Sequence, residues 1–166
     1  MSVSATSMAT EPQGTDTSST SYTPGAGELA IAFCAPLWGF ADQRSYALRP
    51  AARDGIWWLQ STGDDATTFV VADPFVVDAG YVVDLGEKER RTLGIDAPED
   101  ALALVMLALP TAQGGTVTGN FRAPIVINIR THVAMQVVSR DEAHAMQRPM
   151  ALGSYPLRAD ADSPSA

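Results

Sequence analysis

The stretch 101–109, ALALVMLAL, is the longest unbroken apolar run in this chain of 166 residues. Its length of nine residues is far below the roughly 20 that a membrane-spanning helix needs. From Glu28 onward, short runs rich in Val, Ile, Phe and Trp alternate with Gly, Pro and Asp. Such spacing is typical of an all-β sandwich or barrel. We therefore expect one small, mainly β, barrel-like domain of antiparallel strands.

The apolar runs define the expected strands, and two other stretches look helical. GEKERRTL at 86–93 is strongly charged between breakers, and RDEAHAM at 140–146 lacks β-branched residues, so we expect one or two short peripheral helices. The expected strands are 29–33, 46–48, 56–60, 68–71, 81–84, 101–109, 116–120, 125–129 and 134–138.

The two ends of the chain differ from the middle in composition. Residues 1–27 contain twelve Ser or Thr and few bulky apolar side chains, so burial cannot offset the entropy lost on ordering them. We expect a disordered tail over 1–27, a folded domain over 28–158 and a second disordered tail over 159–166. The length of the chain leaves room for one domain.

Composition narrows the classes of function. The single cysteine, Cys34, cannot form an internal disulfide, which suits a reducing cytoplasm, and its apolar neighbours favour a buried small side chain. The N-terminus has no Lys, no Arg and no apolar core of a signal peptide, so export and membrane insertion are disfavoured. A net charge of −8 has the wrong sign for direct binding of nucleic acid.

The negative charge is concentrated in one segment. Residues 62–100 carry ten acidic and three basic side chains, a net charge of −7. One interpretation is a solvated face that aids solubility. The other is a docking surface for a basic partner.

Motifs that would carry chemistry are weak. The Gly pattern at 25–30 leads into an expected strand, whereas a dinucleotide fingerprint opens a helix. His132 and His144 lie twelve residues apart without a nearby Cys, which argues against a metal site; we expect the first in a turn or strand edge and the second on an exposed helix. The acidic pairs 64–65 and 99–100 look like turns, and no GxSxG elbow is present. We expect no enzymatic activity, cofactor or metal.

The doublet Trp57-Trp58 lies within an expected strand. Adjacent side chains of a strand point to opposite faces, so one Trp is expected in the core and the other outside. The outer Trp would then be covered by a loop or the tail, or it would be an anchor for a protein partner.

The motifs together resemble the FliW family of flagellar assembly factors. The resemblance spans 28–158 and rests on LWGF at 37–40, WLQS at 58–61, FVVADPF at 69–75, DAPED at 96–100, GNFRAPIVIN at 119–128, QVV at 136–138 and YPLR at 155–158. Three features depart from the family. APLWGF at 35–40 replaces the usual Gly-Leu-Pro-Gly-Phe, residues 139–154 look like an insertion, and the N-terminal tail has no known counterpart.

The resemblance implies a cytoplasmic regulator, monomeric when free, that binds two proteins. One is flagellin, held as by a chaperone; the other is CsrA, an RNA-binding translational repressor that the family antagonises. Candidate residues for an acidic CsrA-docking surface are Asp64, Asp65, Asp78, Asp84, Glu87 and Glu89, and those for an apolar flagellin-binding patch are Trp38, Phe40, Trp57 and Trp58. The alternative function is that of a small-molecule-binding β-barrel or an unrecognised enzyme.

Overall fold

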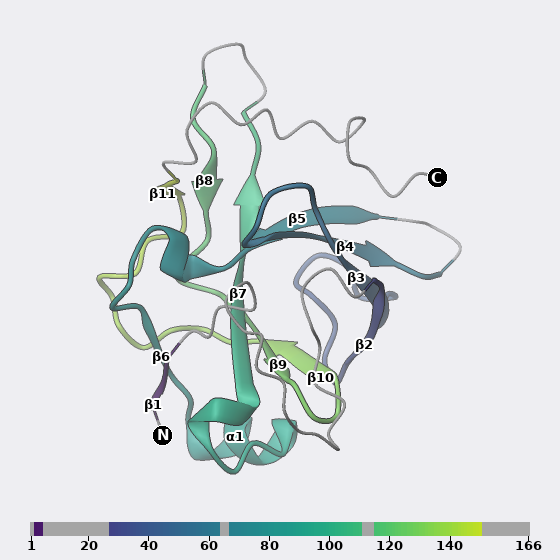
Figure 1. The fold of residues 1–166 in the computed structure, drawn as a ribbon. Helices are drawn as coiled ribbons and strands as arrows, with labels where there is room; N and C mark the ends of the chain where they lie inside the picture. Colours follow the sequence, from purple (N-terminus) through teal and green to yellow (C-terminus); the bar gives the residue numbers. More distant parts are fainter. Residues whose placement is uncertain (1, 5–26, 64–66, 111–114, 151–166) are drawn as a thin grey trace.

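A seven-stranded β-barrel forms the centre of the molecule (Figure 1). The computed structural model describes residues 2–4, 27–63, 67–110 and 115–150. The barrel strands are β2 (Leu29–Phe33), β3 (Ser45–Pro50), β4 (Ile56–Ser61), β5 (Thr68–Ala72), β7 (Ala101–Ala108), β9 (Ile125–Asn128) and β10 (Val133–Gln136). The prediction of a mainly β, barrel-like domain is confirmed.

The strands close in the order β7-β5-β4-β3-β2-β10-β9, and β9 pairs again with β7. All neighbours in this ring are antiparallel except β10 and β2, which are parallel with Val133 opposite Ala32. The strands are therefore antiparallel, as expected, at every junction of the ring but this one. The reason is geometric, because a ring with an odd number of strands cannot alternate direction at every step.

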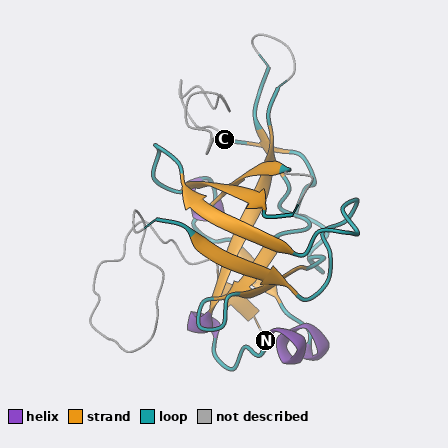
Figure 2. Cartoon of the chain, turned by 90° about the vertical axis from the view of Figure 1, so that its right-hand side faces the viewer, coloured by secondary structure: helices purple, strands orange, loops and turns teal. Residues whose placement is uncertain are grey.

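Short elements extend and cover the barrel (Figure 2). The strands β8 (Thr118–Gly119) and β11 (Arg148–Pro149) continue the sheet beyond β7, and β11 was not expected from the sequence. Outside the ring, β1 (Ser2–Ser4) pairs antiparallel with β6 (Val82–Asp84). Two 3-10 turns, η1 (Pro74–Val76) and η2 (Pro98–Asp100), precede β6 and β7. Residues 2–4, which lie inside the expected tail, form β1, while 5–26 and the C-terminal residues 151–158 and 159–166 lie outside the described residues, so the tails stay a prediction.

The single α-helix of the described residues is α1 (Glu87–Leu93), which confirms the helix expected at 86–93. It ends at Gly94, whose φ of 69° is left-handed and whose N–H bonds back to the last turn, as in a common helix C-cap. The helix expected at 140–146 is wrong, because this segment forms turns. There the Ser139 hydroxyl accepts the Asp141 N–H and the Asp141 carboxylate accepts the Ala143 N–H, which offers the backbone an alternative to helix.

The interior of the barrel is filled by an inner core to which all seven ring strands contribute. Along each strand these side chains alternate with outward-facing ones, as the pleat of a strand requires. Its buried members are Ile31, Phe33, Leu37, Tyr46, Leu48, Trp57, Leu59, Val71, Leu102, Leu104, Ile125, Ile127 and Ala134.

An outer core covers the outside of β4, β5, β7 and β9. It combines outward side chains of these strands with residues from the segments that wrap around them. Its buried members are Ile56, Trp58, Val70, Ala72, Tyr81, Val83, Leu85, Leu93, Ile95, Ala101, Ala103, Val105, Phe121, Val126, Val137 and Met150. The strand β7 is therefore buried on both faces, which accounts for its unbroken apolar sequence.

The motif at 119–128 is held in place by its two asparagines. The Asn120 side chain accepts the N–H groups of Arg122 and Ala123. The buried Asn128 side chain donates to the carbonyls of Leu93 and Gly94 at the end of α1, at 2.8 and 3.1 Å. Both residues satisfy backbone groups that would otherwise be unpaired, so this family-like motif is a structural one.

Candidate functional site

The aromatic doublet on β4 does not form a surface site. Trp57 is 1% exposed within the inner core and Trp58 is 3% exposed within the outer core. The two side chains point to opposite faces, as expected, but the outer face is covered by the wrapping segments. The expectation that one of them joins an exposed patch is therefore wrong.

Trp38 is the most exposed aromatic side chain among the described residues, at 58%. It lies in the turn between β2 and β3, which is fixed at both ends. Leu37 is buried in the inner core, and Phe40 meets Phe69 edge-on with ring centroids 4.9 Å apart. The Trp38 N–H also donates to Oε1 of Gln136 at 3.3 Å. The turn thus presents a large aromatic ring from a braced backbone, whereas Phe40 is only partly exposed.

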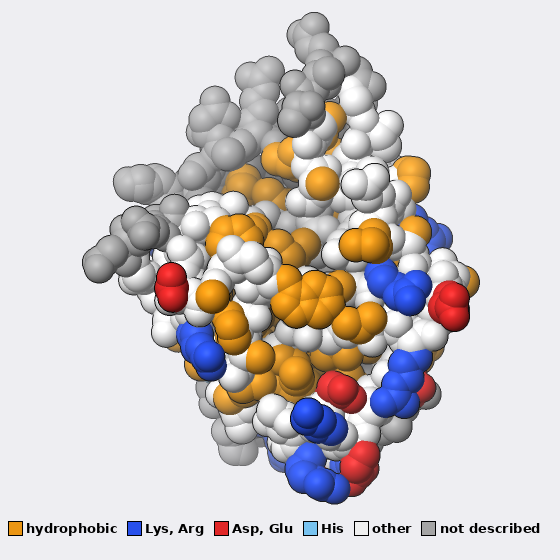
Figure 3. Space-filling view, turned by 180° about the vertical axis from the view of Figure 1, so that it is seen from behind, with side chains coloured by type: hydrophobic (Ala, Val, Ile, Leu, Met, Phe, Trp, Pro, Cys, Tyr) orange, Lys and Arg blue, Asp and Glu red, His pale blue; other side chains and the backbone are white. Residues whose placement is uncertain are grey.

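Apolar side chains gather on one face of the molecule. Figure 3 shows them over the middle of the face seen from behind, with charged side chains of both signs below and on both sides. Besides Trp38, the large exposed hydrophobic side chains among the described residues are Val76, Val82, Val138 and Met146. A contiguous apolar area rimmed by charge is a common feature of protein-binding sites.

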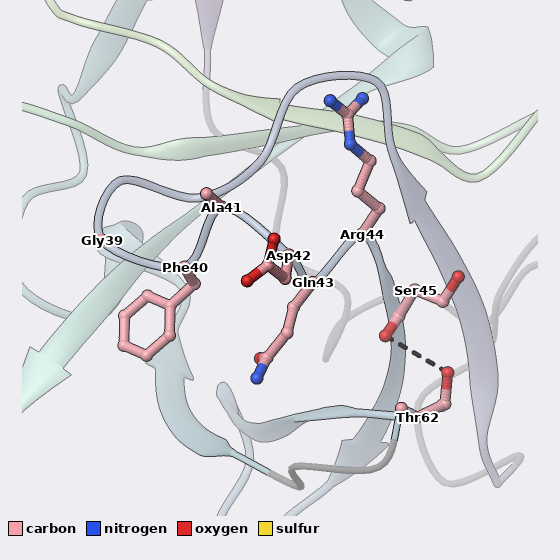
Figure 4. A pocket seen from close by; sticks show the side chains of 9 residues that line it. Gly39, Phe40, Ala41, Asp42, Gln43, Arg44, Ser45 and Thr62 are labelled. Carbon is pink, nitrogen blue, oxygen red and sulfur yellow. Dashed lines mark hydrogen bonds between the residues drawn. The ribbon is translucent and has the colours of Figure 1, made fainter.

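A hollow of about 660 Å³ adjoins the Trp38 turn and is lined by residues 39–45 with Thr62 and Gly63. Figure 4 shows Arg44 pointing away from the side chains of Phe40 and Gln43. The Thr62 hydroxyl donates to the Ser45 carbonyl at 3.2 Å and so joins the two loops. The hollow lies between loops, whereas the interior of the barrel is occupied by the buried side chains of the inner core.

The residues of the expected acidic surface lie in several different environments. Asp64 and Asp65 lie outside the described residues. The Asp78 carboxylate accepts a 2.8 Å bond from Nη1 of Arg148, and this bond, assisted by the Gly80 N–H, lowers the pKa of Asp78. Asp78 therefore serves mainly to fasten one loop to another.

The helix α1 is not an acidic surface on balance. Glu87 pairs with Arg90 at 2.8 Å and with Arg91 at 2.9 Å, and the hydrogen bonds from these guanidinium groups lower the pKa of Glu87. With Glu89 and Lys88, the helix holds two acidic and three basic side chains. Asp84, at the end of β6, is exposed. A docking role for these carboxylates stays a prediction.

The structure places the two histidines in different settings. His132 lies in the turn before β10 with a φ of 64°, in agreement with the expected turn. His144 is not exposed on a helix, because its side chain is 12% exposed, its Nδ1 lies 2.6 Å from Oγ of Ser139, and its ring meets that of Tyr81. Since Ser139 is itself buried, its hydroxyl cannot reach a substrate, and the cluster is structural.

Cys34 is half-buried against the outer core and its thiol donates to the carbonyl of Ala134 at 3.4 Å. Within the described part of the chain, no group of His, Cys, Asp and Glu side chains could hold a metal ion. No helix in the same residues is long and apolar enough to cross a membrane.

Comparison with known proteins assigns the domain. The family model of the FliW protein matches residues 16–150, so the match begins inside the segment expected to be a tail. A flagellar assembly factor FliW of Bacillus licheniformis is 31% identical over 124 residues, covering 74% of this chain and 86% of the relative. That of Syntrophus aciditrophicus is 38% identical over 104 residues, covering 62% of this chain and 65% of the relative.

A crystal structure of the flagellar assembly factor FliW has the same fold, with a TM-score of 0.65 and 24% sequence identity. The superposition covers 76% of this chain and 86% of the other. The barrel, the match of the family model over most of the described residues and the curated relatives agree with one another. The chain belongs to the FliW family of flagellar assembly factors.

Proposed function

We propose that this chain binds flagellin as a cytoplasmic chaperone and antagonises a CsrA-type RNA-binding regulator, coupling flagellin synthesis to filament assembly. Membership of the FliW family is the observation that carries the proposal. The protein acts by binding two protein partners in turn, without catalysis. The geometry supports this function through a braced, exposed aromatic side chain and the separate exposed carboxylates of Asp84 and Glu99.

Flagellin docks on the Trp38 turn in this proposal. Segments that await assembly as amphipathic helices must present an apolar face, and such a face binds to an apolar surface. Trp38 offers a large ring at low entropic cost because Leu37 and Phe40 already hold the turn. Trp57 and Trp58 can contribute only by keeping the barrel folded.

The test compares two exposed apolar side chains. Truncating a central aromatic anchor costs about 2 kcal/mol or more, roughly thirtyfold in affinity. We expect Trp38→Ala to weaken flagellin binding by this amount, measured by titration calorimetry, without lowering the melting temperature. The matched control is Met146→Ala, which truncates another strongly exposed side chain and should leave affinity unchanged. Unchanged binding by Trp38→Ala, with its fold intact, would move the flagellin site elsewhere.

The CsrA-type partner docks by charge. A regulator that binds RNA carries basic surface, which exposed carboxylates attract over about 8 Å at physiological ionic strength. We expect Asp84→Lys with Glu99→Lys, which reverses the two exposed carboxylates named above, to slow association in surface plasmon resonance and to flatten its salt dependence. The control is Glu28→Lys, which reverses a carboxylate that lies outside the segment 62–100 and is paired with Arg49. Equal association rates for all three chains would contradict the electrostatic account.

A further inference from the structure

The turn that carries Trp38 runs from Leu37 to Phe40. The Phe40 N–H donates to the Leu37 carbonyl at 2.9 Å, and Gly39 has a φ of 91°. A positive φ at the third residue is a feature of tight turns that favour glycine there. Trp38 is the second residue, and the N–H at that position takes no part in the bond that closes a turn. This N–H can therefore bond to an acceptor outside the turn.

The acceptor is the side chain of Gln136 at the end of β10. Its Oε1 accepts the Trp38 N–H at 3.3 Å, and its Nε2 donates to the Ala123 carbonyl at 3.1 Å. A glutamine amide has one accepting and one donating end, so this orientation satisfies both neighbours, whereas the reverse would oppose like groups on each side. The peptide unit between Leu37 and Trp38 is thus bonded at both its oxygen and its hydrogen.

The backbone of Gln136 is itself fixed, so its side chain starts from a rigid strand. Gln136 pairs with Ile125 of β9. The segment before the turn is tied to the same strand β10, because the Cys34 N–H donates to the Ala134 carbonyl at 2.9 Å. The connection between β2 and β3 is therefore held to β10 twice, once where β2 ends and again at the Trp38 turn.

We propose that Gln136 is a positioning residue for Trp38, and that its side-chain amide holds the turn in the conformation from which the exposed ring meets a protein partner. The inference rests on the proposed function in taking that partner to be flagellin. An anchor that is already ordered loses less entropy on binding, so Gln136 contributes to affinity by ordering the turn. The bond of 3.3 Å is slightly longer than usual for an N–H donor, so the expected contribution is modest.

The first experiment measures the turn in the absence of any partner. Amide hydrogen exchange, followed by NMR on the full-length chain, reports local opening at the Trp38 N–H. Gln136→Met keeps the length of the side chain and removes both of its hydrogen bonds. We expect the Trp38 N–H to exchange about three- to tenfold faster in this variant, which is the effect of losing one ordinary hydrogen bond. An unchanged rate would overturn the proposal.

The matched control is Gln60→Met. Gln60 is a half-buried glutamine of β4 that pairs with Ala47 and Thr68. The same chemical change at this position should leave the exchange rate of Trp38 as it is in the unchanged chain. An equal acceleration in both variants would show a general loosening of the barrel and would overturn the specific role of Gln136.

A second variant separates the two bonds of the amide. Gln136→Glu keeps an oxygen that can accept the Trp38 N–H and loses the donor to the Ala123 carbonyl. We expect exchange at Trp38 to stay at the rate of the unchanged chain, even where the melting temperature falls with that of Gln136→Met. Fast exchange in both variants would mean that the turn responds to the loss of the Ala123 bond, and would overturn the direct route through Trp38.

The last experiment measures flagellin affinity by titration calorimetry in a double-mutant cycle. Gln136→Met should weaken binding about three- to tenfold through the added cost of ordering the turn, and Gln60→Met should leave it unchanged. In the Trp38→Ala background, Gln136→Met should cause no further loss, because a ring that is absent cannot be positioned. Additive losses would mean that Gln136 acts on the partner by another route, and would overturn the proposal.

The two kinds of measurement separate this inference from the proposed function. If the unchanged chain does not bind flagellin, the proposed function fails, while the exchange rate at Trp38 still decides whether Gln136 orders the turn. If flagellin binds the unchanged chain and Gln136→Met equally well although exchange at Trp38 is faster, the proposed function stands and the positioning role is overturned.

Discussion

The inner and outer cores meet across β4, and they are built in different ways. Trp57 enters a core made almost wholly by the seven ring strands, whereas Trp58 enters one that needs Tyr81, Leu93 and Met150 from segments outside the ring. The inner core follows from the alternation along strands. The outer core depends on where segments distant in the sequence cross the barrel. Only the inner core can therefore be predicted from the alternation of apolar residues along each strand.

The two cores also differ in the hydrogen bonding of their buried tyrosines. In the inner core, the Tyr46 hydroxyl is buried without a hydrogen-bond partner in the described residues, and burial raises its pKa. In the outer core, the Tyr81 hydroxyl donates to the Phe121 carbonyl at 2.8 Å, and burial raises its pKa strongly. The inner core is held by apolar packing, while the cover over the outer core is also fastened by specific hydrogen bonds.

The largest expected effect tests whether both faces of β4 are equally buried. Trp57→Ala and Trp58→Ala should each lower the free energy of unfolding by about 3–5 kcal/mol, because each leaves a large cavity. Urea denaturation followed by circular dichroism measures this. A loss below about 1 kcal/mol for Trp58→Ala alone would mean that the outer core is open, and Trp58 would then return as a candidate anchor.

A smaller effect is expected where the outer cover joins the barrel. Asn128→Ala should cost about 2–3 kcal/mol, since it leaves buried backbone groups of α1 and the following turn without partners. Asn128→Asp separates the two roles, because it keeps the acceptor for the Arg130 N–H and loses the donors to Leu93 and Gly94. If both variants unfold at the same urea concentration as the unchanged chain, Asn128 does not join the helix to the sheet.

Removing the hydroxyl group from each of the two buried tyrosines should change the stability of the fold in opposite directions. Tyr81→Phe should cost about 1–2 kcal/mol, because the buried Phe121 carbonyl loses its donor. Tyr46→Phe should be neutral or stabilising, because it removes a hydroxyl that has no partner in the described residues. Thermal unfolding of both variants measures the difference. Equal changes in melting temperature would contradict the distinction between an inner core held by apolar packing and an outer core held also by hydrogen bonds.

The smallest effect concerns the ion pair between Asp78 and Arg148. A carboxyl whose pKa is lowered by folding stabilises the fold above its ordinary pKa of about 4, and this contribution is lost as the pH falls through the lowered value. Arg148→Ala should cost less than about 1 kcal/mol at pH 7, as for other partly exposed pairs. The same variant should lose less stability than the unchanged chain between pH 5 and pH 2. A steeper loss in the variant would contradict the assigned direction.

The strands could be predicted from the sequence because runs rich in Val, Ile and Trp, bounded by Gly and Pro, favour strands through local interactions alone. Eight of the nine runs overlap barrel or extension strands, and the run at 81–84 overlaps β6. β11 has only two residues, too short for any periodic pattern. β1 lies in a polar segment, and its strand exists because a distant edge is available.

The candidate site was predicted less well, for reasons of tertiary structure. Trp38 could be proposed because it sits in a turn beside a glycine, where exposure is the ordinary outcome. The burial of Trp58 could not, because its cover includes Met150, ninety-two residues further along the chain. At 140–146, helix propensity was outweighed by side-chain hydrogen bonds of Ser139 and Asp141 and by the docking of His144 on Tyr81.

The parallel junction between β2 and β10 has a consequence for the speed of folding. Cys34 and Ala134, which join at this seam, are 100 residues apart in the chain. Closing such a long loop is entropically costly, and proteins dominated by non-local strand pairs fold in milliseconds to seconds. During synthesis the first strand emerges long before its neighbour, so β2 has an unpaired edge until β10 has been made. The chain is thus exposed to edge-to-edge aggregation through β2 while it is being translated.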